Sequence, residues 1–161
     1  MMKFIVGIAL VGFTTYCGIF LSKKYKVRKT FFEEAYAFNT SVLEELNFTK
    51  RPFEEFYQKR SFKGEFSGLL MEEHRRRNLK KTLPLELEKY SFLNVDEKRF
   101  FAEYLSTLGR GDTVSQKAFF SRAGDSLQSF KIKAIEECKK YVDLYTKMGF
   151  LLGLAILIIL I

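Results

Sequence analysis

The chain has 161 residues, of which 47% are hydrophobic and 16% aromatic, with 27 Lys and Arg against 19 Asp and Glu. A net charge of +8 favours anionic lipid, an acidic protein or nucleic acid as a partner. Two apolar terminal segments leave residues 22–147, which carry +7 and suffice for one small domain, so a multidomain protein is excluded. The two cysteines, Cys17 and Cys138, predict neither a disulfide nor a metal site.

The N-terminal apolar segment, residues 4–21, carries no charge and is long enough to cross a bilayer. A basic cluster follows it, where a secretory signal peptide would have a small-residue cleavage site. The cluster consists of Lys23, Lys24, Lys26, Arg28 and Lys29. We therefore predict a transmembrane helix within residues 1–22, with these five side chains at the membrane surface.

The first helix is expected to continue beyond the basic cluster, because apolar residues recur at helical spacing up to residue 46. They are Phe31, Ala35, Phe38, Val42 and Leu46. Residues 47–51 break this pattern, and Pro52 suits the first position of a second helix. A third helix is predicted over residues 65–80, with outer ion pairs from Glu72 to Arg76 and from Glu73 to Arg77.

Pro84 opens a short segment, and Asn94 with Glu97 three residues later marks the start of the next helix. Its core residues are expected to be Phe100, Phe101, Tyr104, Leu105 and Leu108. Gly109 ends this helix, because glycine adopts the backbone conformation that turns the chain.

The last helix is predicted to start at a capping box formed by Thr113 and Gln116. Its apolar stripe is Val114, Ala118, Ala123, Leu127, Phe130, Ala134, Cys138, Val142 and Tyr145. Residues 148–161 then carry no polar side chain. Together with residues 141–147, and with Lys140 and Lys147 reaching toward water, this segment approaches a full bilayer span. A half-inserted anchor is the alternative.

These patterns predict an all-α protein in three parts, because no strand-like alternation occurs. Residues 1–22 form a transmembrane helix with a short extracytosolic N-terminus, 23–147 a cytosolic helical bundle, and 148–161 a C-terminal transmembrane helix. The excess of Lys and Arg beside both spans places the bundle in the cytosol and both termini outside.

The sequence predicts no catalytic, cofactor-binding or metal-binding residue, so we expect that the protein is not an enzyme. His74 is the one histidine, and no second ligand stands at metal-binding spacing from it. The glycines around Arg110 lack the lysine and the spacing of a phosphate-binding loop.

Two clusters are candidates for partner binding. The first is Arg75, Arg76 and Arg77, which either docks an acidic partner or nucleic acid or, as we favour, is a solvated helix face. The second is the turn between the last two helices, which is either a structural connector or a membrane-distal tip that meets a cytosolic partner. Its residues are Gly109, Arg110, Gly111, Asp112 and Gln116.

The chain resembles the stage III sporulation protein AB family of endospore-forming bacteria. The similarity is sharpest in Leu108-Gly109-Arg110-Gly111-Asp112 with Gln116, and in the closing run from Tyr145 to Leu154. The Pro52-Phe53-Glu54-Glu55-Phe56 helix start and the two terminal spans agree with it. The family typically has serine where Gly111 stands, which weakens a capping role at that position.

The resemblance implies a component of the channel complex between mother cell and forespore, located in the mother-cell membrane. The bundle would be similar to the cytoplasmic domain of type II secretion F proteins. Its partners would be a secretion-type ATPase, stage III sporulation protein AA, and other AA to AH components. The alternative is a membrane-anchored protein that binds anionic lipid or nucleic acid through its basic clusters, and of these two ligands nucleic acid is the less expected.

Overall fold

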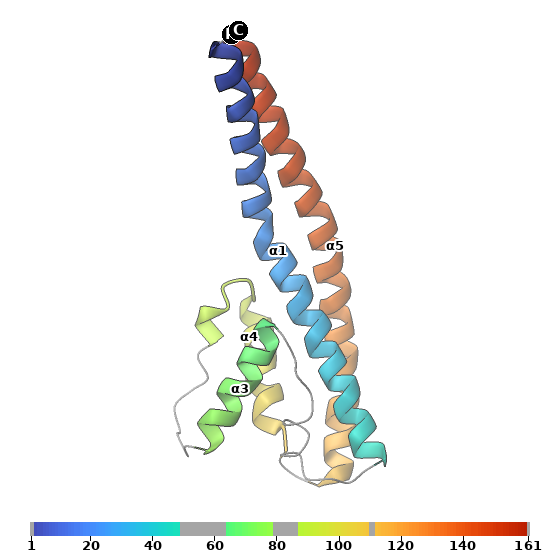
Figure 1. Ribbon diagram of the computed structural model, residues 1–161. Coiled ribbons are helices and arrows are strands. Elements are labelled where there is room, and N and C mark those ends of the chain that lie inside the picture. Colours follow the sequence, from blue (N-terminus) through green and yellow to red (C-terminus); the bar gives the residue numbers. More distant parts are fainter. Residues whose placement is uncertain (1, 49–63, 79–86, 110–111, 161) are drawn as a thin grey trace. The chain divides into compact units, whose positions relative to one another are not determined.

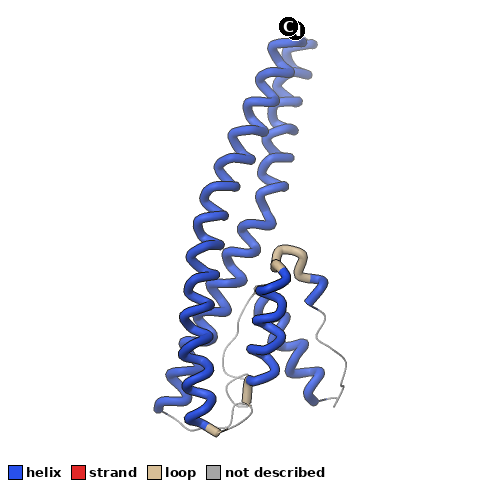
Figure 2. The backbone as a smooth tube through the Cα atoms, turned by 180° about the vertical axis from the view of Figure 1, so that it is seen from behind, coloured by secondary structure: helices blue, strands red, loops and turns tan. Residues whose placement is uncertain are grey.

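The computed structural model describes residues 2–48, 64–78, 87–109 and 112–160, and within these ranges it contains helices and connections but no strand (Figures 1 and 2). The helices are α1 (Met2–Phe48), α3 (Glu65–Asn78), the 3₁₀ helix η1 (Leu87–Lys89), α4 (Val95–Thr107) and α5 (Thr113–Leu160). The all-α prediction is confirmed. The helix expected to begin at Pro52 lies outside the described residues.

The chain divides into two compact units. The helix-pair unit comprises Met1–Lys29 and Lys133–Ile161, and the bundle unit comprises Thr30–Ile132. α1 and α5 each contribute one segment to each unit. This division follows packing, so the bilayer boundaries expected at residues 22 and 148 stay predictions.

The bundle unit is built around aromatic rings from three helices. The Phe31 ring of α1 lies 5.5 Å from that of Phe66 on α3 and 5.1 Å from that of Phe101 on α4, both edge to face. Such pairs contribute about 0.5–1.5 kcal/mol each beyond the burial of their surface. The stripe predicted on α1 is confirmed from Phe31 to Val42, where all four of its residues are fully buried.

The two ends of α4 follow the predicted local signals. The Asn94 side chain accepts a hydrogen bond from the Glu97 amide, and the Glu97 carboxylate accepts one from the Asn94 amide, which completes a capping box. At the other end the Leu108 amide donates to the Leu105 carbonyl, and Gly109 follows with φ of 73°. A glycine at this positive φ turns the chain without the strain that a side chain would add.

The start of α5 differs from the prediction, because the capping residue is Asp112 rather than Thr113. Its carboxylate accepts the amides of Val114 and Ser115 at 3.1 Å, and its carbonyl accepts the Gln116 amide at 3.0 Å. Asp caps as well as Thr does, and its charge also interacts favourably with the positive end of the helix dipole. Hydrogen bonds from the Ser115 hydroxyl and amide lower the pKa of this carboxyl.

The first part of the stripe predicted on α5 is also wrong. Val114 and Ala118 are exposed, whereas Gln116 and Phe120 are buried. The buried positions continue through Ala123, Leu127 and Ala134, at spacings of three, four and seven residues, and these three were predicted. The prediction missed this register because the first buried residue, Gln116, is polar. The apolar residues Val114 and Ala118 on either side of it therefore resemble the start of the stripe.

The helix-pair unit holds the ends of α1 and α5 in antiparallel contact (Figure 1). Glycines allow the two backbones to approach: a methyl group added at Gly18 would lie 2.3 Å from the Tyr145 carbonyl oxygen, and one at Gly149 would lie 2.6 Å from that of Thr14. Close backbone contact through small residues is how helices associate in lipid.

Both helices are long and apolar enough to cross a membrane. Their most apolar 18-residue windows are only 17% and 11% buried within the structure, whereas a core helix of a soluble protein is mostly buried. Large apolar side chains such as Phe13, Phe20 and Leu151 point outward instead. This exposure is consistent with a membrane protein.

Candidate interaction surfaces

The predicted arginine cluster is mostly engaged within the bundle unit. The Glu73 carboxylate is buried and binds both Arg76 and Arg77 at 2.8 Å. The Glu73 to Arg77 pair is therefore confirmed, whereas Arg76 pairs with Glu73 rather than with Glu72 as predicted. Glu72 instead binds Lys89 of η1, a contact that the helical spacing alone did not indicate.

Arg77 also closes the end of α4. Its guanidinium donates to the carbonyls of Leu105 and Leu108, which lie in the last turn of that helix and beyond it. The Leu105 carbonyl also accepts the Leu108 amide, and because carbonyls in the last turn of a helix lack the usual amide four residues on, Arg77 supplies further donors at this end. Of the three arginines, Arg75 remains exposed.

The described residues of the predicted turn hold the two helices in place. Asp112 caps α5, Gly109 supplies the positive φ, and Gln116 is buried with 7% of its surface exposed. Arg110 and Gly111 lie outside the described residues. Gln116 is therefore removed from the surface on which it was expected.

The basic cluster near the first span is divided by burial. Lys23, Lys24 and Lys26 are exposed, and Lys29 is half-buried. Arg28 is 8% exposed, and its Nε lies 3.0 Å from the Glu137 carboxylate on the other helix of the pair. Arg28 therefore joins the two helices, a role that the position of a basic residue beside a span did not predict.

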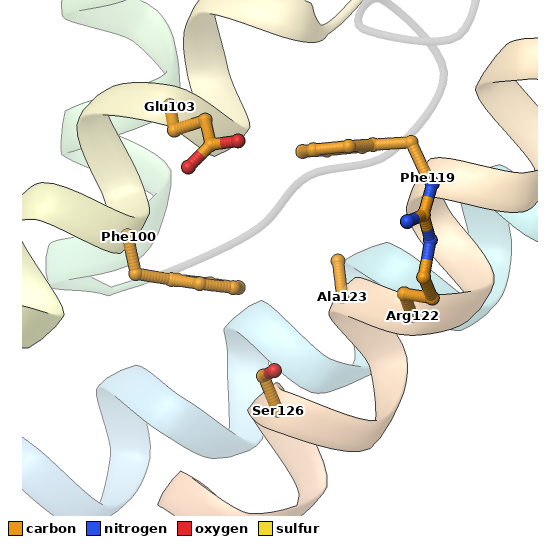
Figure 3. Close-up of a pocket in the computed structure, with 6 residues that line it drawn as sticks. All are labelled: Phe100, Glu103, Phe119, Arg122, Ala123 and Ser126. Atoms are coloured by element: carbon orange, nitrogen blue, oxygen red, sulfur yellow. The ribbon is translucent and has the colours of Figure 1, made fainter.

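An open groove lies between α4 and α5 in the bundle unit, with a volume of about 280 Å³. It is lined by Phe100, Glu103, Phe119, Arg122, Ala123 and Ser126. Figure 3 shows the Phe100 and Phe119 rings on opposite sides of the groove, with the Glu103 carboxylate beside them. Both rings are half-buried, whereas Glu103 and Arg122 are exposed.

The groove was not predicted, although the sequence contains a signal for it. Phe100-Phe101 and Phe119-Phe120 are both doublets, and neighbouring residues of a helix point about 100° apart. When Phe101 and Phe120 point into the core, the adjacent Phe100 and Phe119 must lie at its edge. Burial agrees, since Phe101 and Phe120 are fully buried.

A buried polar bridge supports the groove from within. The Tyr104 hydroxyl of α4 donates to Asn39 Oδ1 on α1 at 3.1 Å, and Asn39 Nδ2 donates to the Phe120 carbonyl of α5 at 3.0 Å. Tyr104 stacks on Phe100 with centroids 5.8 Å apart, and Phe120 packs edge to face on Phe119 at 5.3 Å. The bridge therefore sets the spacing of both aromatic walls.

Comparison with known families decides the identity. The family model for stage III sporulation protein AB matches residues 3–161. The chain belongs to this family. Neither the curated proteins nor the solved structures contain a match. The resemblance expected from the turn and the closing run is confirmed, and the chain is a stage III sporulation protein.

In this family member, the Glu34 carboxyl on α1 caps the start of α3. It accepts backbone hydrogen bonds from Phe66 and Ser67, and a methyl group added at Gly64 would lie 2.0 Å from it. Burial nevertheless raises the pKa of this carboxyl, because one of its oxygens is buried without a hydrogen-bond partner. Glu34 is thus a structural group whose charged form is disfavoured by burial.

Within the part of the chain that the structure describes, no group of three or more His, Cys, Asp or Glu side chains could hold a metal ion.

Proposed function

We propose that this stage III sporulation protein AB family member is a non-enzymatic membrane platform of the channel complex between mother cell and forespore. Its cytosolic bundle would dock a secretion-type ATPase, stage III sporulation protein AA, beside other AA to AH components. The observation that carries the docking proposal is the groove between α4 and α5, which leaves two aromatic rings and two charged side chains open to a partner.

The platform part rests on family membership and on the two long apolar helices. Their apolar segments belong to the helix-pair unit, which exposes large apolar side chains, as expected for helices facing lipid. The Lys and Arg residues that follow the first span and precede the second favour a cytosolic bundle with both termini outside. The mother-cell membrane follows from the family resemblance.

The groove has the chemistry of a protein docking site. Aromatic residues and Arg are enriched where proteins bind one another, and a small apolar cleft can receive an anchoring side chain. Within the described residues, the Glu103 and Arg122 side chains take part in no ion pair, so each is available to an opposite charge of the partner. The proposed occupant is a segment of the ATPase that has an apolar anchor with a charged residue on each side.

The charge of the bundle unit favours a protein partner over nucleic acid. Residues 30–132 contain 17 basic and 16 acidic side chains, so their net charge is only +1. Nucleic-acid binding depends on a basic surface that neutralises many phosphates. The arginine cluster does not supply one, because Arg76 and Arg77 are bound to Glu73.

The proposal that the protein is not an enzyme is supported by the use of its buried polar residues. Asn39 bridges three helices, Glu73 binds two arginines, and Glu97 completes a capping box. Each is committed to holding the bundle together. A His74→Ala variant tests this proposal, and we expect it to retain full function in sporulation.

The test uses the full-length protein in lipid nanodiscs and the purified ATPase, with binding measured by biolayer interferometry. Arg122→Glu should weaken binding by about 10-fold or more, because a reversed charge would face the partner. Arg99→Glu is the matched control, since Arg99 is an exposed arginine on α4 outside the groove. It should change affinity less than about twofold.

Three results would count against this assignment. Loss of binding in Arg75→Glu but not in Arg122→Glu would move the docking surface to the arginine cluster. Equal losses in Arg122→Glu and Arg99→Glu would indicate a general charge effect. Absence of binding by the folded wild-type protein to an active ATPase would refute the docking proposal.

A further inference from the structure

The positive charge of the protein is concentrated in the helix-pair unit. Residues 1–29 and 133–161 contain 10 basic and 3 acidic side chains, a net charge of +7 of the total +8. Apart from Lys3, all of these charges lie in residues 23–29 and 133–147, directly beside the two apolar segments. Nearly all of the net positive charge of the protein therefore lies in the helix-pair unit, next to its apolar segments.

Three tyrosines join the two helices at this level. The Tyr25 ring of α1 stacks on the Tyr141 ring of α5, with centroids 4.6 Å apart and planes 17° apart. The Tyr145 ring lies 6.1 Å from Tyr25. Tyrosine is enriched at membrane interfaces, where its ring contacts acyl chains and its hydroxyl reaches the headgroups.

A lysine from each helix lies over this stack. Lys24 Nζ is 5.0 Å from the centre of the Tyr25 ring, and Lys140 Nζ is 5.5 Å from the centre of the Tyr141 ring. The stack therefore brings one lysine from each helix, 116 positions apart in the chain, to the same level of the helix pair, one beside each ring. We call Lys24, Tyr25, Lys140, Tyr141 and Tyr145 the tyrosine–lysine collar.

The charges at the collar are not neutralised by the acidic residues nearby. Of the three acidic residues here, Glu137 pairs with Arg28, Asp143 pairs with Lys147, and Glu136 is exposed. Within the described residues no ion pair involves the lysines of the collar or the exposed lysines beside it. These lysines are Lys23, Lys24, Lys26, Lys139 and Lys140. An excess of exposed cations beside lipid-facing helices requires anions from outside the protein.

From these observations we infer that the tyrosine–lysine collar is a binding site for the headgroups of anionic phospholipids. Phosphodiester groups bind the ammonium groups of Lys24 and Lys140, a tyrosine hydroxyl donates to a phosphate oxygen, and the acyl chains lie along the apolar segments. Both helices are needed, so the site exists only when the helix pair is assembled. It does not depend on the docking of an ATPase.

The test measures lipid binding by the full-length protein in a non-ionic detergent, with dioctanoyl phosphatidylglycerol as the anionic probe and dioctanoyl phosphatidylcholine as the zwitterionic one. The wild type should prefer phosphatidylglycerol by at least about 10-fold, since each well-placed lysine contributes a factor of about 5. Lys24→Gln with Lys140→Gln should weaken phosphatidylglycerol binding by about 30-fold.

The matched control removes two charges elsewhere on α5, with Lys117→Gln and Lys131→Gln. Lys131 also lies over a tyrosine ring, that of Tyr36 at 3.9 Å, but in the bundle unit. This double variant should bind phosphatidylglycerol as the wild type does. Circular dichroism should show the same helical content in all three proteins.

Equal binding of the two lipids by the wild type would overturn the inference, and so would equal losses in the collar and control variants. Glycerol phosphate and a single-stranded oligonucleotide serve as competitors. Displacement of the lipid by the oligonucleotide at equal phosphate concentration would assign the lysines to nucleic acid instead. Displacement by glycerol phosphate at that concentration would show a site for free phosphate rather than for a lipid.

Discussion

The buried bridge from Tyr104 through Asn39 to Phe120 gives the sharpest stability prediction. Tyr104 is fully buried and Asn39 is 1% exposed, so neither group can replace a lost partner with bulk water. Tyr104→Phe removes one hydroxyl, keeps the ring and leaves Asn39 Oδ1 without its donor. The expected loss in the free energy of unfolding is about 1–3 kcal/mol.

Asn39→Leu removes two hydrogen bonds and strands the Tyr104 hydroxyl in the core, which should cost about 2–4 kcal/mol. When both partners are replaced by apolar groups, no stranded donor or acceptor remains between them. The double variant should therefore lose less than the sum of the single variants, by about 1–3 kcal/mol.

Urea unfolding of the full-length protein in detergent, followed by circular dichroism, measures these differences. Tyr90→Phe is the matched control, because the bond from the Tyr90 hydroxyl to the Glu65 carbonyl is long, at 3.4 Å. It should cost less than about 0.5 kcal/mol. Strict additivity of Asn39→Leu and Tyr104→Phe, or a Tyr104→Phe loss no larger than that of Tyr90→Phe, would refute the bridge.

Three further predictions concern the bundle unit. Gly109→Val should lower stability by about 1–2 kcal/mol because of its positive φ, whereas Gly109→Asn should be better tolerated, as thermal unfolding will show. Arg77→Met should lower the free energy of unfolding by about 3 kcal/mol, because it leaves the buried Glu73 with only one of its two arginines. Arg75→Met should lower it by less than about 0.5 kcal/mol. Equal losses in the two variants would contradict the capping role of Arg77. Burial raises the pKa of Glu34 in the folded state, so its contribution to stability is complete below the unfolded pKa and is lost as pH rises through the folded pKa. Glu34→Gln should therefore reduce the decline in the free energy of unfolding from about pH 4 to about pH 7. An unchanged pH profile would contradict this.

Features encoded by near neighbours were predictable from the sequence. The α1 stripe from Phe31 to Val42 and the capping box of Asn94 and Glu97 each depend on residues within a few turns of one another. Where two adjacent residues could both act as a cap, the choice was wrong: Asp112 and Thr113 are both capping residues, and the structure has Asp112, the stronger of the two, in this role.

Features that depend on distant segments were not predictable in the same way. The Arg77 guanidinium reaches carbonyls 28 and 31 residues away, and the groove forms because α4 and α5 each turn one phenylalanine of a doublet to the core. The collar joins Tyr25 to Tyr141. Composition indicated a basic protein, but the assignment of nearly all net charge to the helix-pair unit required knowledge of which segments pack together.

The close approach of the helix pair has a consequence for the order of folding. Gly18 and Gly149 meet across 131 residues of chain, and closing so long a loop costs conformational entropy before any contact compensates it. Inside the bundle unit, however, Asn39 and Phe120 already hold α1 and α5 together. Once the bond from Asn39 to Phe120 and the contacts around it form, the segments of α1 and α5 in the helix-pair unit can pair turn by turn from that point, without closing a long loop. A substitution at Asn39 should therefore slow assembly of the glycine contacts, although it lies in the other unit.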